Sequence, residues 1–123
     1  MMRILIADDD PTICELISDL LIRDGFEVHT VNEMADARQW LEQNEVDLLL
    51  SDYTIDEGDT VDFIKDTLRR YSDISIIVMS GYLDETLIEQ LTKIGVSRCF
   101  VKPFSYGNLL ETLRNIEAER REQ

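Results

Sequence analysis

The stretch ILIADDDP, residues 4–11, decides how this chain of 123 residues folds. Its four apolar residues are typical of a strand that is buried on both faces of a parallel sheet. The aspartates and proline that follow are typical of a helix start, where proline fits the first turn and Asp10 accepts backbone N–H groups. The stretch therefore predicts a buried strand, a polar turn at its carboxyl end and a helix directly after it.

The same alternation of an apolar run and a segment with helical period recurs along the chain. We expect strands at residues 4–7, 26–31, 46–50, 74–79 and 99–101. Apolar residues at helical spacing follow each run, and Gly25 and Gly95 close the first and fourth helices. This order predicts a single domain over residues 1–123, an α/β fold whose parallel sheet is covered by helices on both faces.

Several side chains have expected places within these elements. Asn32 is expected to cap the second helix and Ser105 the last one, because short polar side chains satisfy the free N–H groups of a first turn. His29, the only histidine, is expected to face solvent on an edge strand. The first helix is expected to bury one apolar stripe, formed by Ile13, Leu16, Ile17, Leu20 and Leu21.

The composition excludes several classes of function. The formal net charge is −14, from 26 acidic and 12 basic residues, so direct binding of nucleic acid or an anionic membrane is not expected. Cys14 and Cys99 form neither a disulfide framework nor a metal-binding spacing, and reduced thiols suit the cytosol. The first apolar run is too short for a signal peptide, and no run reaches transmembrane length. The sequence therefore predicts a cytoplasmic protein.

Side chains able to do chemistry follow four of the expected strands. The first strand ends in Asp8 and Asp9, the third in Asp52, the fourth in Ser80 and the fifth in Lys102. An open parallel sheet places its site beyond the carboxyl ends of its strands, so these residues are expected to meet at one edge.

The charges at this edge favour a cation. Asp8, Asp9 and Asp52 carry −3 together and Lys102 carries +1, which leaves −2. Two carboxylates ~5 Å apart repel by roughly 3 kcal/mol at an effective dielectric constant near 20. Oxygen ligands without a histidine or cysteine cluster suit Mg²⁺, with Mn²⁺ as the alternative. Carboxylates, a metal and a lysine together indicate phosphoryl chemistry, with Asp52 as nucleophile and Ser80 as a donor to a phosphoryl oxygen.

Four motifs carry a resemblance to a known family: ILIADD at 4–9, DLLLSD at 47–52, VMSG at 78–81 and VKPF at 101–104. In this order and spacing they resemble the receiver domains of bacterial response regulators, over residues 3–116. The resemblance implies a five-stranded parallel sheet with strand order 2-1-3-4-5, in a flavodoxin-like three-layer α/β/α sandwich. It also implies a phosphoacceptor signalling domain of a two-component phosphorelay, with self-phosphorylation and autodephosphorylation chemistry, and not an enzyme.

The resemblance implies a role for each site residue. Asp52 is expected to accept the phosphoryl group in the presence of Mg²⁺. Asp9 is expected to bind the metal directly, Asp8 through water, and Thr54 through its backbone carbonyl.

The remaining implied roles concern the bound phosphoryl group and the switch that reads it. Ser80 resembles the switch hydroxyl and Lys102 the lysine that contacts the phosphoryl group, with a cis Lys102–Pro103 peptide bond. Cys99 stands at the position of the usual switch aromatic. Three aromatic residues are candidates to replace it on the switch face: Tyr82, Phe100 and Tyr106.

Two further departures from the family concern the loop after Asp52. The family often has Met-Pro after the phosphoacceptor, whereas this chain has YTID at residues 53–56. Thr60 stands where a glycine is usual, and Asp56 or Glu57 would add negative charge near the metal.

The resemblance also implies partners. A sensor histidine kinase or a histidine phosphotransfer protein is the expected donor, and an output domain or a separate protein the expected target. A homodimer is an alternative that the sequence leaves open. The charged segment at residues 117–123 is interpreted as a solvated helix tail or the start of a linker.

Three other readings compete with a phosphorylated receiver. A receiver-shaped module could signal without phosphorylation, which the unusual loop and Cys99 favour. A haloacid-dehalogenase-type phosphatase needs a second aspartate two residues after its nucleophile, where this chain has Thr54. A flavodoxin needs a Ser/Thr-rich phosphate loop after the first strand, where three carboxylates would repel a phosphate.

Overall fold

The computed structural model describes residues 1–55 and 59–122, and in this part of the chain strands and helices alternate throughout. The strands are β1 (Arg3–Ala7), β2 (Glu27–Val31), β3 (Leu48–Asp52), β4 (Ser75–Ser80) and β5 (Arg98–Val101). The helices are α1 (Pro11–Arg23), α2 (Met34–Gln43), α3 (Thr60–Arg70), α4 (Glu85–Ile94) and α5 (Tyr106–Arg121). All strands are parallel in the order β2-β1-β3-β4-β5, which confirms the expected sheet.

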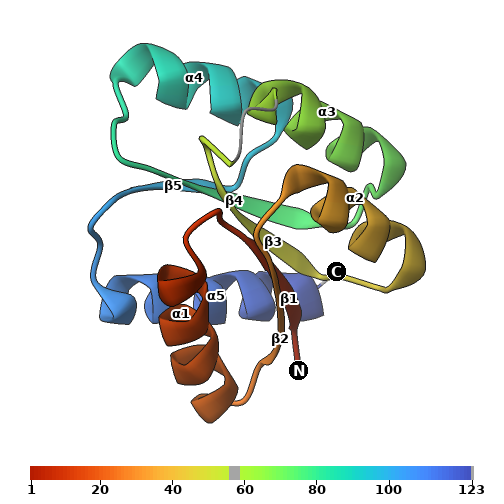
Figure 1. Cartoon of the computed structure of the whole chain (residues 1–123), viewed down its shortest axis with the longest axis vertical. Helices are drawn as coiled ribbons and strands as arrows, with labels where there is room; N and C mark the ends of the chain where they lie inside the picture. The colour runs from red at the N-terminus through yellow and green to blue at the C-terminus, as the bar shows by residue number, and fades with distance from the viewer. Residues whose placement is uncertain (56–58, 123) are drawn as a thin grey trace.

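The helices lie in two layers on either side of the sheet (Figure 1), with α1 and α5 on one face and α2, α3 and α4 on the other. Successive side chains of a strand point to opposite faces, so β1 contributes to both cores. Ile4 and Ile6 pack with α1 and α5, whereas Leu5 packs with the other three helices. The continuous apolar runs of β1, β3 and β4 follow from this burial on both faces.

Two of the three proposed helix caps are confirmed. The Asp10 carboxylate accepts from the N–H groups of Thr12 and Ile13, and the Ser105 hydroxyl accepts from the N–H of Asn108. The prediction for Asn32 is wrong. The cap position of α2 belongs to Glu33, which makes no side-chain cap bond, and the Asn32 amide instead donates to the carbonyl of Asp8.

The glycine that ends α4 is required for two reasons. Gly95 has a φ of +112°, the left-handed region that an L side chain rarely adopts. A Cβ atom at this position would also lie 3.1 Å from Cδ1 of Leu68 on α3. The turn therefore lets α4 and α3 pack closely on the same face of the sheet.

Two sequence-based expectations about which side chains are buried and which face solvent are corrected. The stripe expected on α1 is too broad: Ile17 and Leu21 are buried, but Leu16 is 60% exposed. His29 does not simply face solvent, because its ring stacks on Trp40 of α2 with centroids 3.4 Å apart and planes 5° apart. Burial in this stack lowers the pKa of His29 below its usual value.

The carboxyl end of α5 is attached to the sheet. Arg120 donates to the Asp73 carbonyl, lies 3.2 Å from the Ser75 hydroxyl and forms a 3.4 Å ion pair with Asp47. Asp47 also binds the guanidinium and the backbone N–H of Arg3. The last turn of α5 is therefore fixed to the amino ends of the strands, and Arg120 is not solvated as a free tail would be.

None of the helices within the described ranges has the length and apolarity needed to cross a bilayer.

Candidate functional site

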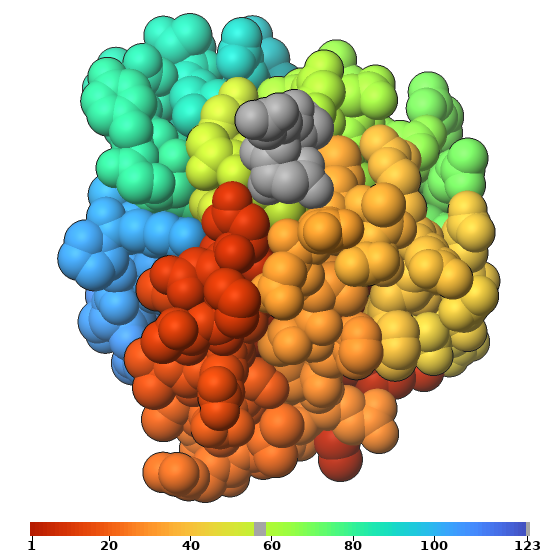
Figure 2. Space-filling model, viewed as in Figure 1, coloured from red at the N-terminus to blue at the C-terminus, as the bar shows by residue number. Residues whose placement is uncertain are grey.

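The carboxyl ends of β1 and β3 bring three aspartates together. Carboxylate oxygens of Asp8, Asp9 and Asp52 all lie within 4.8 Å of one another. Asp8 and Asp52 are buried, while Asp9 is exposed. In Figure 2 the red segment after β1 meets the yellow-green segment after β3 at the surface, with the blue segment after β5 beside it. The structure thus brings together at this edge the acidic residues that the sequence placed there.

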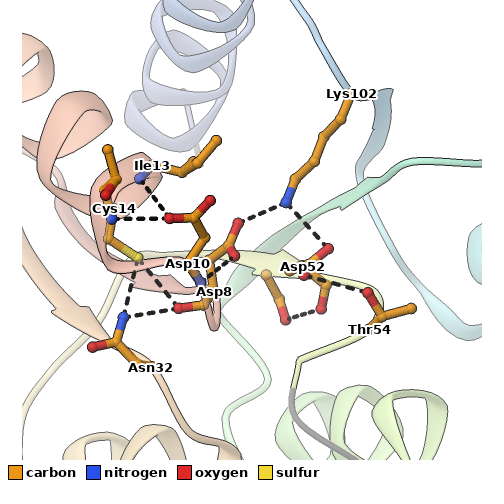
Figure 3. Close-up of polar contacts among 10 residues, drawn as sticks. Asp8, Asp10, Ile13, Cys14, Asn32, Asp52, Thr54 and Lys102 are labelled. Atoms are coloured by element: carbon orange, nitrogen blue, oxygen red, sulfur yellow. Dashed lines mark hydrogen bonds and ion pairs between the residues drawn. The ribbon is translucent and has the colours of Figure 1, made fainter.

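Lys102 completes the charge cluster from the end of β5. Its Nζ lies 2.7 Å from Oδ2 of Asp8 and 3.4 Å from Oδ1 of Asp52 (Figure 3). The backbone N–H of Lys102 donates to the Ser80 carbonyl at 2.7 Å, and the expected cis bond to Pro103 is present. Burial alone would lower the pKa of Lys102, but hydrogen bonds and attraction to Asp8 and Asp52 outweigh it, so the pKa is raised. The lysine therefore remains a cation.

Asp8 is held at all three of its oxygens. Oδ2 accepts from Lys102, and Oδ1 accepts from the N–H of Asp10 at 3.0 Å. The backbone carbonyl accepts from Nδ2 of Asn32 at 2.9 Å and from the thiol of Cys14 at 3.4 Å. Burial, followed by the charge of Asp8, raises the pKa of Cys14 to about 11, so the thiol keeps the proton that it donates.

Asp52 is 4% exposed, and its charged form is disfavoured. Burial raises its pKa, the negative charge of Asp8 raises it further, and Lys102 only partly opposes both effects. The Thr54 hydroxyl lies 3.4 Å from Oδ2 of Asp52, at the outer limit of a hydrogen bond. A cation beside Asp52 would therefore favour the carboxylate form that a nucleophile needs.

The Ser80 hydroxyl is directed to the loop that follows β4. Its Oγ donates to the carbonyl of Tyr82 at 2.7 Å and accepts from the N–H of Tyr82 at 3.2 Å. Ser80 is almost fully buried at the end of the strand beside β3. The hydroxyl therefore lies at the predicted edge, with the backbone of Tyr82 as its partner.

The four proposed switch-face residues have different surroundings. Tyr82 is 71% exposed, and Cys99 is a half-buried free thiol whose pKa burial raises. Phe100 packs beside Phe104, with ring centroids 5.3 Å apart, on the α1 and α5 side of the sheet. The Tyr106 hydroxyl donates to Asp24 at 2.6 Å, and burial in this contact raises its pKa to about 12. Tyr106 is therefore engaged with the α1–β2 turn.

The loop after β3 carries the remaining departures from the family pattern. Asp56 and Glu57, proposed to add charge near the metal, lie outside the described residues. Thr60 is the first residue of α3, and its buried hydroxyl has no hydrogen-bond partner within the described ranges.

Sequence reasoning missed the contacts of Asn32 and Cys14 with Asp8. One signal was available for Asn32, because it directly follows the strand expected beside β1. The signal for Cys14 was weaker, since its helical position predicts burial and not a particular partner.

The donor set fits Mg²⁺. The three carboxylates supply only oxygen ligands, and the exposure of Asp9 leaves room for the waters that Mg²⁺ retains. Fixed buried carboxylates, a lysine and an adjacent hydroxyl are the groups that position and stabilise a phosphoryl group in transfer reactions.

Comparisons with known proteins identify the family of this chain. A family model for the response regulator receiver domain matches residues 4–114. Chemotaxis protein CheY of Bacillus subtilis is 30% identical over 112 residues, covering 90% of this chain and 93% of CheY. KdpE, a transcriptional regulatory protein of Staphylococcus aureus, is 30% identical over 115 residues, covering 94% of this chain and 49% of KdpE. The chain thus spans about half of KdpE, and only 25% of the regulator NtrC of Bradyrhizobium.

Solved structures show the same fold. A CheY-like receiver domain protein from Methanospirillum hungatei has a TM-score of 0.93 at 21% identity, covering 99% of this chain and 98% of that one. The beryllofluoride-activated receiver domain dimer of NtrC4 has a TM-score of 0.91 at 25% identity, covering 98% and 99%.

Fold and site together define a doubly wound α/β domain with an acidic site at the carboxyl ends of its strands. The chain belongs to the response regulator receiver domain family, whose members act in two-component signalling.

Proposed function

We propose that this receiver domain accepts a phosphoryl group on Asp52 with the help of Mg²⁺ and then changes a surface that a partner binds. The observation that carries the proposal is the buried Asp52 carboxylate, which lies within reach of both the Lys102 ammonium and the two aspartates after β1. Asp9 and Asp52 would bind the metal directly and Asp8 through water. The proposed third protein ligand, the carbonyl of Thr54, stays a prediction.

In the proposed reaction an Asp52 oxygen attacks phosphorus, forming an O–P bond while the P–N bond to the donor histidine breaks. The bound metal ion would neutralise charge on the phosphoryl oxygens. Lys102 would supply a second positive charge, and its tether to Asp8 keeps the ammonium beside Asp52. Ser80 would turn from the backbone of Tyr82 to donate to a phosphoryl oxygen, which releases the loop before α4.

The proposed donor is a helix that carries the phosphohistidine of a sensor kinase or a phosphotransfer protein. An apolar groove of about 470 Å³ lies directly beside the site. Its lining includes Ile13, Leu16 and Leu20 of α1 and Phe104 of the segment after β5. Lys102 belongs to both groove and site, so a helix seated in the groove would reach Asp52.

The switched surface is proposed to be that of α4, β5 and α5, and its partner is an output domain or a separate protein. KdpE and NtrC are regulators that extend beyond the region similar to this chain, which supports an output domain as one alternative. The dimer of the NtrC4 receiver supports a homodimer as another. Turnover would be limited to self-phosphorylation and autodephosphorylation. The cytoplasmic location stays a prediction.

The proposal is tested by incubating the protein with Mg²⁺ and acetyl phosphate and measuring its intact mass. We expect one added phosphoryl group, none for Asp52→Asn, and an unchanged result for Asp36→Asn, which alters an exposed carboxylate on α2. No added mass on the unmodified protein, or addition that survives Asp52→Asn, contradicts the proposal. Sustained hydrolysis of simple phosphate esters would favour a phosphatase instead.

A further inference from the structure

Two side chains outside the acidic cluster converge on one backbone oxygen of Asp8. Nδ2 of Asn32 lies 2.9 Å from this carbonyl oxygen, and the Cys14 sulfur lies 3.4 Å from it. Figure 3 shows both donors on the side of Asp8 away from Lys102, with Nδ2 of Asn32 also 3.6 Å from the sulfur. The proposed phosphoryl transfer uses neither residue.

Asn32 replaces a backbone donor at the point where the sheet ends. The register pairs Ala7 with Val31, and the N–H of Asp8 still donates to the Val31 carbonyl at 3.1 Å. The next bond of a parallel ladder would bring the backbone N–H of Glu33 to the Asp8 carbonyl. The chain turns into α2 here, and the Asn32 amide donates instead.

We propose that Asn32, assisted by the Cys14 thiol, is a positioning residue that fixes the Asp8–Asp9 peptide and thereby sets the affinity of the acidic cluster for a divalent cation. This inference rests on the proposed Mg²⁺ site, and it concerns how this chain builds that site. Asn32 acts through Asp9, and it does not touch the ion.

The peptide plane transmits the effect. The Asp8 carbonyl and the Asp9 N–H belong to one rigid planar unit, so fixing the carbonyl fixes the point from which the Asp9 side chain leaves the backbone. The Asp8 carboxylate is anchored separately by Lys102 and the N–H of Asp10. The exposed Asp9 carboxylate has no ion pair with any described residue. Its position therefore depends on its backbone more than that of Asp8 does.

The test is a Mg²⁺ titration without any phosphodonor. Its readout is the change in the backbone NMR shifts of residues 8–10 and 52. We expect Asn32→Ala to weaken Mg²⁺ binding by roughly tenfold, which is the smallest loss of affinity usual when a residue that orients a metal ligand is removed. Cys14→Ser keeps a donor and is expected to bind Mg²⁺ nearly as the unmodified protein does. Cys14→Ala is expected to weaken binding less than Asn32→Ala does.

Asn44→Ala is the matched control. Its amide also donates to a backbone carbonyl, that of Trp40, but at the opposite end of α2. We expect this variant to bind Mg²⁺ as the unmodified protein does, even if its thermal stability falls as much as that of Asn32→Ala. A loss of affinity confined to Asn32→Ala therefore reports positioning and not general destabilisation.

The outcomes separate this inference from the proposed function. If the unmodified protein binds Mg²⁺ and Asn32→Ala binds it equally well, or if Asn44→Ala loses the same affinity, the positioning role is wrong and the proposed function stands. If the unmodified protein does not bind Mg²⁺, both fall. Asn32→Gln keeps an amide on a longer stem, and recovery of part of the affinity would support the hydrogen bond as the cause.

Discussion

The ammonium nitrogen of Lys102 lies 2.7 Å from Oδ2 of Asp8. The lysine is thus held by a carboxylate that is not the proposed acceptor, while its distance to Asp52 is 3.4 Å. Asp8 keeps Lys102 within reach of the acceptor but does not leave it paired with Asp52 alone. A phosphoryl group on Asp52 could then meet an ammonium group that is already in place.

Removing this lysine is expected to destabilise the fold. Lys102→Gln leaves Asp8 and Asp52 buried beside each other without their cation, which costs roughly 3 kcal/mol by the values for broken buried ion pairs. Urea unfolding in EDTA measures the loss, and saturating Mg²⁺ is expected to restore part of it. Lys93→Gln, which alters an exposed lysine on α4, is the control. Equal stability of Lys102→Gln and the unmodified protein would contradict the electrostatic description of the site.

Mg²⁺ itself is expected to stabilise the folded protein, because the ion offsets repulsion among the three carboxylates. At a free concentration 100 times the dissociation constant, the gain in unfolding free energy is about 2.7 kcal/mol. Thermal unfolding with Mg²⁺ and then with excess EDTA measures it. Asp9→Asn should abolish most of the gain and Asp36→Asn should retain it. A gain that survives Asp9→Asn would place the ion elsewhere.

The attachment of α5 gives a separate prediction. Arg120→Gln removes bonds to Asp47 and the Asp73 carbonyl, and should cost about 1.5 kcal/mol, the lower value for hydrogen bonds to charged groups. Hydrogen exchange should become faster in the last two turns of α5. Arg121→Gln, a neighbouring exposed arginine, should change neither property. If hydrogen exchange in α5 is equally fast in Arg120→Gln and Arg121→Gln, Arg120 does not hold the end of this helix.

Asp47 predicts how stability depends on pH. Burial alone would raise its pKa, but the hydrogen bonds and charge of Arg3, with help from Arg120, lower it below the ordinary value of 3.8. The folded pKa is the lower one, so the stabilisation is complete above the unfolded value and is lost as pH falls through the folded value. Asp47→Asn should therefore flatten the fall in unfolding free energy below about pH 4. If the unfolding free energy of Asp47→Asn falls at low pH as steeply as that of the unmodified protein, this prediction is wrong.

The groove on α1 distinguishes the two kinds of phosphodonor. Leu16 is 60% exposed, so Leu16→Ser should leave stability and phosphorylation by acetyl phosphate nearly unchanged. Transfer from a histidine kinase should fall, because the donor helix loses apolar contact beside Lys102. Phosphotransfer assays with both donors measure the ratio of the rate from the kinase to the rate from acetyl phosphate. The control is Ile22→Ser, which alters an exposed residue at the far end of α1. Equal rates from the kinase would remove the groove from the docking surface.

The apolar runs with polar ends predicted the parallel sheet and the residues at its carboxyl edge, because buried parallel strands leave such runs. The strand order came only from the resemblance to receiver domains. The sequence-based prediction failed where a short polar side chain has two possible hydrogen-bond partners that the sequence does not distinguish. Asn32 follows a strand and precedes a helix, and local patterns favour a cap, whereas the strand order gives it the Asp8 carbonyl. His29 was also misplaced, because its stack on Trp40 depends on how α2 crosses the edge strand.

Reductive trapping tests the central claim most directly. After incubation with Mg²⁺ and acetyl phosphate, borohydride converts an aspartyl phosphate to homoserine, and peptide mass spectrometry locates the changed residue. We predict homoserine at position 52 and none at 8 or 9. Homoserine at another aspartate, or none in a protein that has bound Mg²⁺, would contradict the role of Asp52 as phosphoacceptor.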